Sequence, residues 1–121
     1  MRILQVSAEI FPLLKTGGLA DIAGALPNAL HGVGCEVRVL LPGFPAILAG
    51  LSNAVVVGSF AMPWGQSIEV QFGEFAALGT HSNKQFGYVL VAPSLFDRPG
   101  NPYEDASKQP YADNHRRFAA L

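Results

Sequence analysis

Apolar and polar positions along the first third of the chain follow two periodicities, one typical of strands and one of a helix. Residues 2–7 and 36–41 are short, apolar, β-prone runs that predict buried strands. Between them, apolar residues recur at the i, i+3, i+4, i+7 spacing of one helix face: Leu19, Ile22, Ala23, Leu26, Leu30 and Val33. We expect a kink at Pro27, because an internal proline removes a backbone hydrogen bond. The order strand, helix, strand predicts a βαβ unit and a parallel sheet.

The remaining chain favours strands joined by short turns, followed by a long loop and a last helix. Three β-prone segments follow one another without a helical pattern between them: residues 54–60, 66–72 and 86–92. A loop rich in Pro, Gly and Asp spans 93–111, and 113–121 is helical in pattern but has no stop signal. We therefore predict an α/β fold: a Rossmann-like, three-layer parallel sheet with a β-hairpin or meander in the middle of the chain.

Composition narrows the class of protein. Of the 121 residues, 50% are hydrophobic and 14% are charged, which argues against intrinsic disorder. The net charge of −1 and the absence of a basic cluster exclude a nucleic-acid or anionic-membrane surface. Cys35 is the one cysteine, and the three histidines are scattered, so we expect neither a disulfide framework nor a metal site. No run approaches the roughly 18 apolar residues of a membrane span, and no leader pattern is present, so we expect a cytoplasmic protein.

The loop Lys15-Thr-Gly-Gly18 is the strongest candidate for chemistry. It joins the first strand to the first helix, on the side where α/β sheets bind ligands. Glycines allow a phosphate to approach the backbone, free N–H groups at a helix start favour an anion, and Lys15 adds a positive charge. We expect Thr16 to cap the helix and Asp21 to complement its dipole. The loop is neither a P-loop nor a G-x-G-x-x-G fingerprint, so local chemistry leaves two readings open: a phosphate site, or an ordinary turn with a surface lysine.

Polar segments near the C-terminus favour structural roles on local evidence. Residues 97–103 combine polar, rigid and aromatic groups and are most simply a turn. Residues 113–117 are most simply a helix start, with Asp113 or Asn114 as the cap and both arginines in solvent. Neither segment predicts a site unless the fold brings it to the Lys15 loop.

Several motifs together carry a resemblance to a known family. The segment Ser7-Ala-Glu-Ile-Phe-Pro-Leu-Leu-Lys-Thr-Gly-Gly-Leu-Ala-Asp21 closely resembles the N-terminus of bacterial glycogen synthases and plant starch synthases. Further motifs of the same family follow in the expected order: Ala25-Leu-Pro, Val39-Leu-Leu-Pro42, Leu95-Phe-Asp-Arg-Pro-Gly-Asn-Pro-Tyr103 and Tyr111-Ala-Asp-Asn-His-Arg-Arg-Phe118. The resemblance spans nearly the whole chain, and residues 48–84 are its least diagnostic part.

The resemblance implies a retaining glucosyltransferase of the two-domain GT-B type. Such an enzyme moves glucose from ADP-glucose to the non-reducing end of an α-1,4-glucan and needs no metal or other cofactor. By family analogy Lys15 contacts the donor phosphates, and Gly17 and Gly18 lie near the diphosphate and the glucosyl group. Asp21 falls near the donor or acceptor sugar and is the candidate catalytic residue. Tyr103 is the candidate sugar contact.

The resemblance also implies that residues 1–121 are part of the N-terminal domain, with the C-terminal nucleotide-binding domain absent. We expect the isolated chain to be inactive and its uncovered apolar surface to favour self-association. The missing plastid leader favours the bacterial form of the enzyme. Two alternatives stay open: a non-catalytic α/β module that binds a phosphorylated ligand, and a GT-B relative that uses UDP-glucose, since nucleotide base selectivity is read in the absent domain.

Overall fold

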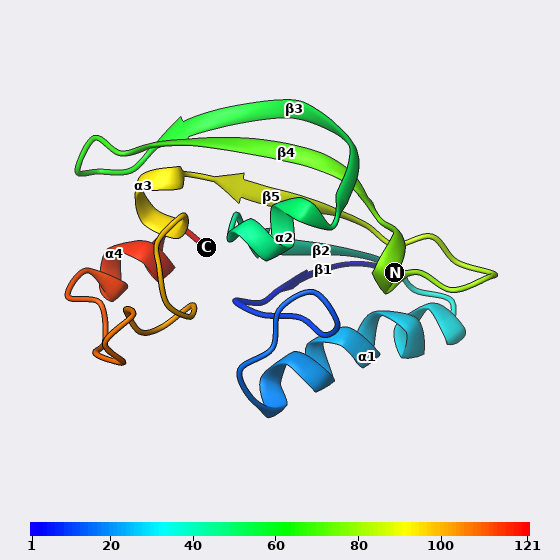
Figure 1. Cartoon of the computed structure of the whole chain (residues 1–121). Coiled ribbons are helices and arrows are strands. Elements are labelled where there is room, and N and C mark those ends of the chain that lie inside the picture. The colour runs from blue at the N-terminus through cyan, green and yellow to red at the C-terminus, as the bar shows by residue number, and fades with distance from the viewer.

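The predicted βαβ unit is present in the computed structural model, which describes residues 1–121. Strand β1 (Arg2–Val6) pairs in parallel with β2 (Glu36–Pro42), and α1 (Gly18–Gly32) connects them. Figure 1 shows α1 running beside the sheet. The other elements, in chain order, are α2 (Pro45–Ala49), β3 (Leu51–Ala61), β4 (Ser67–Phe75), the 3₁₀ helix η1 (Ala76–Leu78), β5 (Phe86–Val91), α3 (Pro93–Phe96) and α4 (Asn114–Ala119).

The predicted meander is also present, and it belongs to the same sheet as the βαβ unit. The strand order is β1-β2-β5-β4-β3. β3 pairs with β4 and β4 with β5 in antiparallel fashion, whereas β5 lies parallel to β2. The sheet is therefore mixed, and the expectation of parallel pairing holds for β1, β2 and β5 only. β3 and β4 form a long, curved hairpin that continues the sheet on the side away from β1 (Figure 1).

Helix α1 is seated directly on the loop that precedes it. The backbone N–H of Phe11 donates to the carbonyl of Ala20 at 2.9 Å. A Cβ atom at Gly24 would collide with the carbonyl oxygen of Phe11, so this position accepts only glycine without a backbone shift. The helix continues through Pro27, which is buried. The close contact places residues 11–16 against the first turns of α1, where the candidate site lies.

The core lies on the α1 side of the sheet, and the opposite face of β1 is open. Val39, Leu41 and Val89 are completely buried. Leu4 and Val6 alternate to the other face of β1 and remain 54% and 47% exposed, so no helix of this chain covers them. None of the helices has the length and hydropathy needed to cross a membrane.

Candidate functional site

Lys15 and Asp21, both predicted site residues, form an ion pair at the start of α1. Lys15 Nζ lies 2.9 and 2.7 Å from the two carboxylate oxygens of Asp21. Their side chains are 47% and 51% exposed, and an exposed pair of this kind contributes only about 0.2–1 kcal/mol. Lys15 can therefore exchange Asp21 for a more strongly charged ligand at small cost.

The two glycines that follow Lys15 leave the helix start accessible. Gly17 is the N-cap of α1 and provides no side-chain cap, and a Cβ at either Gly17 or Gly18 would meet no atom within 4 Å. The prediction that Thr16 caps the helix is wrong. Its hydroxyl instead donates to Oε2 of Glu9, and its backbone N–H approaches the same oxygen at 3.3 Å. The first N–H groups of α1 thus have no side-chain acceptor and are available to an anion.

Glu9 connects the Lys15 loop to Tyr103, which lies in the second segment predicted for the site, the 97–103 loop. Glu9 is 1% exposed. Partial burial is the main cause that raises the pKa of the Tyr103 phenol above its usual range, and the neighbouring Glu9 carboxylate raises it further. Like any tyrosine, Tyr103 carries its proton at neutral pH and can donate a hydrogen bond. The fold supplies the link between the 97–103 loop and the Lys15 loop that local sequence reasoning lacked.

Two cavities flank the ion pair of Lys15 and Asp21. The first, of about 280 Å³, lies between the Lys15 loop, the start of α2 and the 98–102 segment, and it is lined by three cations: Lys15, Arg98 and Arg117. The second, of about 310 Å³, is lined by Asp21 together with Phe11, Pro12 and Gly24. Lys15 and Asp21 thus face different spaces, while Gly17, Gly18 and Tyr103 line neither of these cavities.

Arg117 is the functional-site residue that sequence reasoning placed wrongly. It was expected in solvent, yet it is 1% exposed. Its guanidinium donates to the carbonyls of Leu95 and Pro102 at 2.7 and 2.9 Å, and it lies 4.3 Å from the centroid of the Tyr111 ring. A signal was available, because in the helix expected over residues 113–121 Arg117 lies one turn before Leu121, on the same face. Arg117 ties the 95–102 segment to α4 and so shapes one wall of the first cavity.

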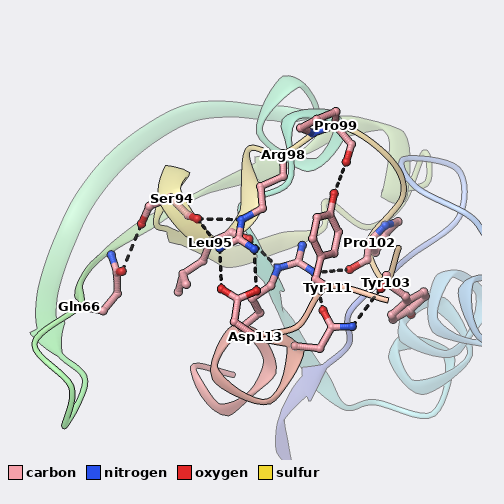
Figure 2. A network of polar contacts seen from close by, with 11 residues as sticks. Gln66, Ser94, Leu95, Arg98, Pro99, Pro102, Tyr103, Tyr111 and Asp113 are labelled. Carbon is pink, nitrogen blue, oxygen red and sulfur yellow. Dashed lines mark hydrogen bonds and ion pairs between the residues drawn. The ribbon is translucent and has the colours of Figure 1, made fainter. Parts of the chain in front are cut away.

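Arg98 holds the same segment through Asp113, as Figure 2 shows. The two guanidinium nitrogens lie 2.7 Å from the two carboxylate oxygens in a bidentate pair, and Arg98 Nε donates to the carbonyl of Ser94 at 2.9 Å. Asp113 was a predicted cap of the last helix; it is the N-cap of α4 but makes no side-chain cap bond. Its carboxylate instead accepts the two hydrogen bonds from Arg98 and so connects the start of α4 to the 94–98 segment.

The ion pair of Arg98 and Asp113 makes the folding stability of the protein depend on pH. The hydrogen bond from Arg98 is the main cause that lowers the pKa of Asp113 below its usual range. A lowered folded-state pKa stabilises the protein above the unfolded pKa of about 4, and this contribution is lost as pH falls through the folded pKa.

We therefore expect Asp113→Asn to lower stability by about 1 kcal/mol at about pH 7, with the difference shrinking as pH falls through the lowered pKa of the folded-state Asp113 carboxyl. The size is modest because the two side chains are 25% and 34% exposed. Thermal unfolding of both proteins across this pH range measures it. Asp97→Asn, at an exposed carboxylate, is the control; an equal pH dependence of the Asp113 and Asp97 variants would contradict the assignment.

Taken together, these residues can bind a negatively charged, hydroxyl-rich ligand. One exposed lysine and the open N–H groups of α1 suit a phosphate group. Asp21 can accept, and Tyr103 can donate, hydrogen bonds with hydroxyl groups. The structure contains no cluster of three or more His, Cys, Asp or Glu side chains that could hold a metal ion.

Comparison with known proteins identifies the family of this chain. A family model described as the starch synthase catalytic domain matches residues 2–121. A glycogen synthase of Variovorax paradoxus is 62% identical over 122 residues, covering 100% of this chain and 24% of that protein. One from Leptothrix cholodnii is 51% identical over 125 residues, covering 100% of this chain and 25% of that protein. The chain thus spans about a quarter of the length of these relatives.

A solved structure supports the fold. The catalytic domain of starch synthase IV from Arabidopsis thaliana, bound to ADP and acarbose, superposes with a TM-score of 0.64 and 21% identity. The match covers 96% of this chain and 22% of the plant protein chain. Because the family model extends over all but the first residue, the chain belongs to the starch synthase catalytic domain family.

Proposed function

We propose that the chain forms part of the acceptor-side, N-terminal domain of a bacterial glycogen synthase. The complete enzyme transfers glucose from ADP-glucose to the non-reducing end of an α-1,4-glucan with retention of configuration. The observation that carries the proposal is the arrangement of Lys15, open glycine backbone and Asp21 at the start of α1, within a chain that is 62% identical to a glycogen synthase along its whole length.

Charge development at the leaving group explains the role of this arrangement. As the bond between glucose and ADP breaks, negative charge builds on the diphosphate. Once Lys15 has exchanged Asp21 for the diphosphate, Lys15 and the free N–H groups of α1 are already in place to stabilise that charge, which lowers the barrier more than it stabilises the bound donor. The pair with Asp21 keeps Lys15 oriented until the donor arrives. Asp21, released from Lys15, then accepts hydrogen bonds from hydroxyl groups of the donor or acceptor sugar.

Tyr103 serves the sugar side of the site. The tyrosine phenol carries its proton at neutral pH, so it donates to a glucosyl hydroxyl, and the aromatic ring offers an apolar face to the sugar. The ring is held in place by the side chain of Phe118, with ring centroids 5.7 Å apart. Donor and acceptor are therefore the proposed partners of the protein, and no cofactor is required.

The second domain of the enzyme, by this proposal, supplies the nucleotide-binding half of the cleft. The uncovered apolar surface of this chain supports the presence of further packing partners: Leu4 and Val6 on the open sheet face, and Leu19 and Ile22 on α1, which are 53% and 67% exposed. In their absence, self-association through these surfaces is the expected behaviour. The enzyme is proposed to act in the cytoplasm, where its soluble substrates are found.

A chimeric enzyme tests the proposed function. Residues 1–121 replace the matching segment of the Variovorax paradoxus glycogen synthase, giving a full-length protein that we call the chimera. We expect the chimera to incorporate glucose from ADP-glucose into glycogen and the isolated chain to incorporate none above a blank without protein. A chimera that folds but prefers UDP-glucose would favour the UDP-glucose relative. Tight binding of ADP by the isolated chain would favour the non-catalytic module.

A further inference from the structure

Glu9 is the one acidic side chain buried in this protein, with 1% of its surface exposed. None of the three ion pairs of the chain includes it. A buried carboxylate without a cation is destabilising unless hydrogen bonds compensate for its lost hydration. The identity of its hydrogen-bond donors therefore indicates what the burial achieves.

Both donors to the Glu9 carboxylate come from Thr16, the residue between Lys15 and Gly17. The Thr16 hydroxyl and the Thr16 backbone N–H, the latter at 3.3 Å, converge on the single oxygen Oε2. Glu9 itself is held at its backbone, because the hydroxyl of Ser7 donates to its carbonyl at 2.6 Å. The contact thus fixes both the main chain and the side chain of Thr16 at the centre of the Lys15 loop.

This contact also decides how α1 begins. A threonine beside a helix start usually turns its hydroxyl onto the N–H groups of the first turn. Here the hydroxyl is taken by Glu9, and the N-cap residue Gly17 has no side chain. The N–H groups in the first turn of α1 therefore have no side-chain cap, and this turn directly follows the loop that carries the Lys15 ammonium group.

The same carboxylate lies beside the second site segment. After partial burial, its negative charge is the next cause that raises the pKa of the Tyr103 phenol, which places the carboxylate near that group. Glu9 therefore contacts the loop assigned to the donor phosphates and acts on the tyrosine assigned to the sugar, without being exposed to either ligand.

We propose that Glu9 is a positioning residue: its carboxylate holds Thr16 away from the first turn of α1, so that Lys15 and the uncapped N–H groups face the diphosphate of a sugar nucleotide together. The inference rests on the proposed function and adds to it a residue that acts through Thr16. Loss of the Glu9–Thr16 contact releases Thr16 from the buried carboxylate, so that the Lys15 loop no longer holds the Lys15 ammonium group and the first N–H groups of α1 in the arrangement that faces the diphosphate.

The test uses the chimera and four variants: Glu9→Gln, Thr16→Val, the double variant, and Glu69→Gln as control. Glu69 is also a part-buried carboxylate, which accepts a hydrogen bond from Gln71 at 2.8 Å on β4. Calorimetry with ADP and steady-state kinetics with ADP-glucose and glycogen are measured on each protein. We expect Glu9→Gln and Thr16→Val each to weaken ADP binding about tenfold and to leave the KM for glycogen unchanged. The double variant should bind ADP no more weakly than the single variant with the lower ADP affinity, because both changes remove the same contact.

Wild-type ADP affinity in Glu9→Gln, additive losses in the double variant, or an equal loss in Glu69→Gln would each overturn the proposal. If Glu9→Gln fails to fold by circular dichroism, Thr16→Val decides, and unchanged ADP affinity in that variant counts against it. If the parent chimera incorporates no glucose, the proposed function fails separately. Titration of the same proteins with inorganic pyrophosphate then tests Glu9 alone, and equal affinities across the set overturn its role.

Discussion

Replacing Lys15 by glutamine in the chimera is expected to lower kcat with ADP-glucose by about 10²–10³-fold. Glutamine has similar length and can still donate a hydrogen bond, but it lacks the positive charge that stabilises the departing diphosphate. The loss corresponds to about 2–4 kcal/mol of transition-state stabilisation, the range for removing one preorganised donor from a developing anion. Initial rates of glucose incorporation at saturating ADP-glucose measure the change.

Loss of the ion pair between Lys15 and Asp21 contributes little to the effect of this substitution. Glutamine also breaks the ion pair with Asp21, but both side chains are about half exposed, and such pairs contribute at most about 1 kcal/mol. The variant should therefore fold with nearly unchanged stability while its kcat collapses. Because the charge acts mainly in the transition state, the KM for ADP-glucose should change far less than kcat.

Lys84→Gln provides the matched control, since it removes an exposed lysine between η1 and β5. Lys84→Gln should behave as the parent chimera, whereas Lys15→Arg should recover part of the rate by restoring the charge at a different geometry. Equal kcat values for Lys15→Gln and the parent chimera would remove Lys15 from the catalytic machinery.

The parts of this structure that sequence could predict are those set by short-range periodicity. β1, α1 and β2 lie within about one residue of the expected bounds, because apolar spacing and flanking glycines decide them locally. Sequence also placed Lys15 and Asp21 at the start of α1, but the ion pair between them was not predicted. The resemblance to glycogen synthases brought in Tyr103, which no local pattern selected.

The features that sequence could not predict depend on partners far along the chain. Whether β5 adds to β2 or starts a separate sheet is decided by pairing across more than forty residues, as in Arg38 opposite Phe86. Thr16 has good cap chemistry, but a buried carboxylate seven residues earlier offers a stronger acceptor. Arg117 has the composition of a surface residue, and only backbone carbonyls supplied by the preceding loop make its burial acceptable.

Arg117→Met is expected to lower the free energy of unfolding of the chain by about 2–4 kcal/mol, because two buried carbonyls lose their donor. Burial of the guanidinium is unfavourable in itself, and desolvation is the main cause that lowers the pKa of Arg117. When both members of a buried ion pair are replaced by apolar residues, relief of this desolvation often makes the change neutral. Here the acceptors are the backbone oxygens of Leu95 and Pro102, which no substitution removes.

Methionine also forfeits the contact of the guanidinium with the Tyr111 ring at 4.3 Å. Urea unfolding followed by circular dichroism measures the difference, and Arg116→Met, one residue earlier at an exposed position, should change stability by less than about 0.5 kcal/mol. Arg117→Lys keeps the charge but cannot reach both carbonyls with one ammonium group, so its stability should fall between those of Arg117→Met and the unaltered chain. Equal urea midpoints for the Arg116 and Arg117 methionine variants would mean that the carbonyls of Leu95 and Pro102 find other donors, and that α4 is held to the 95–102 segment by its apolar contacts alone.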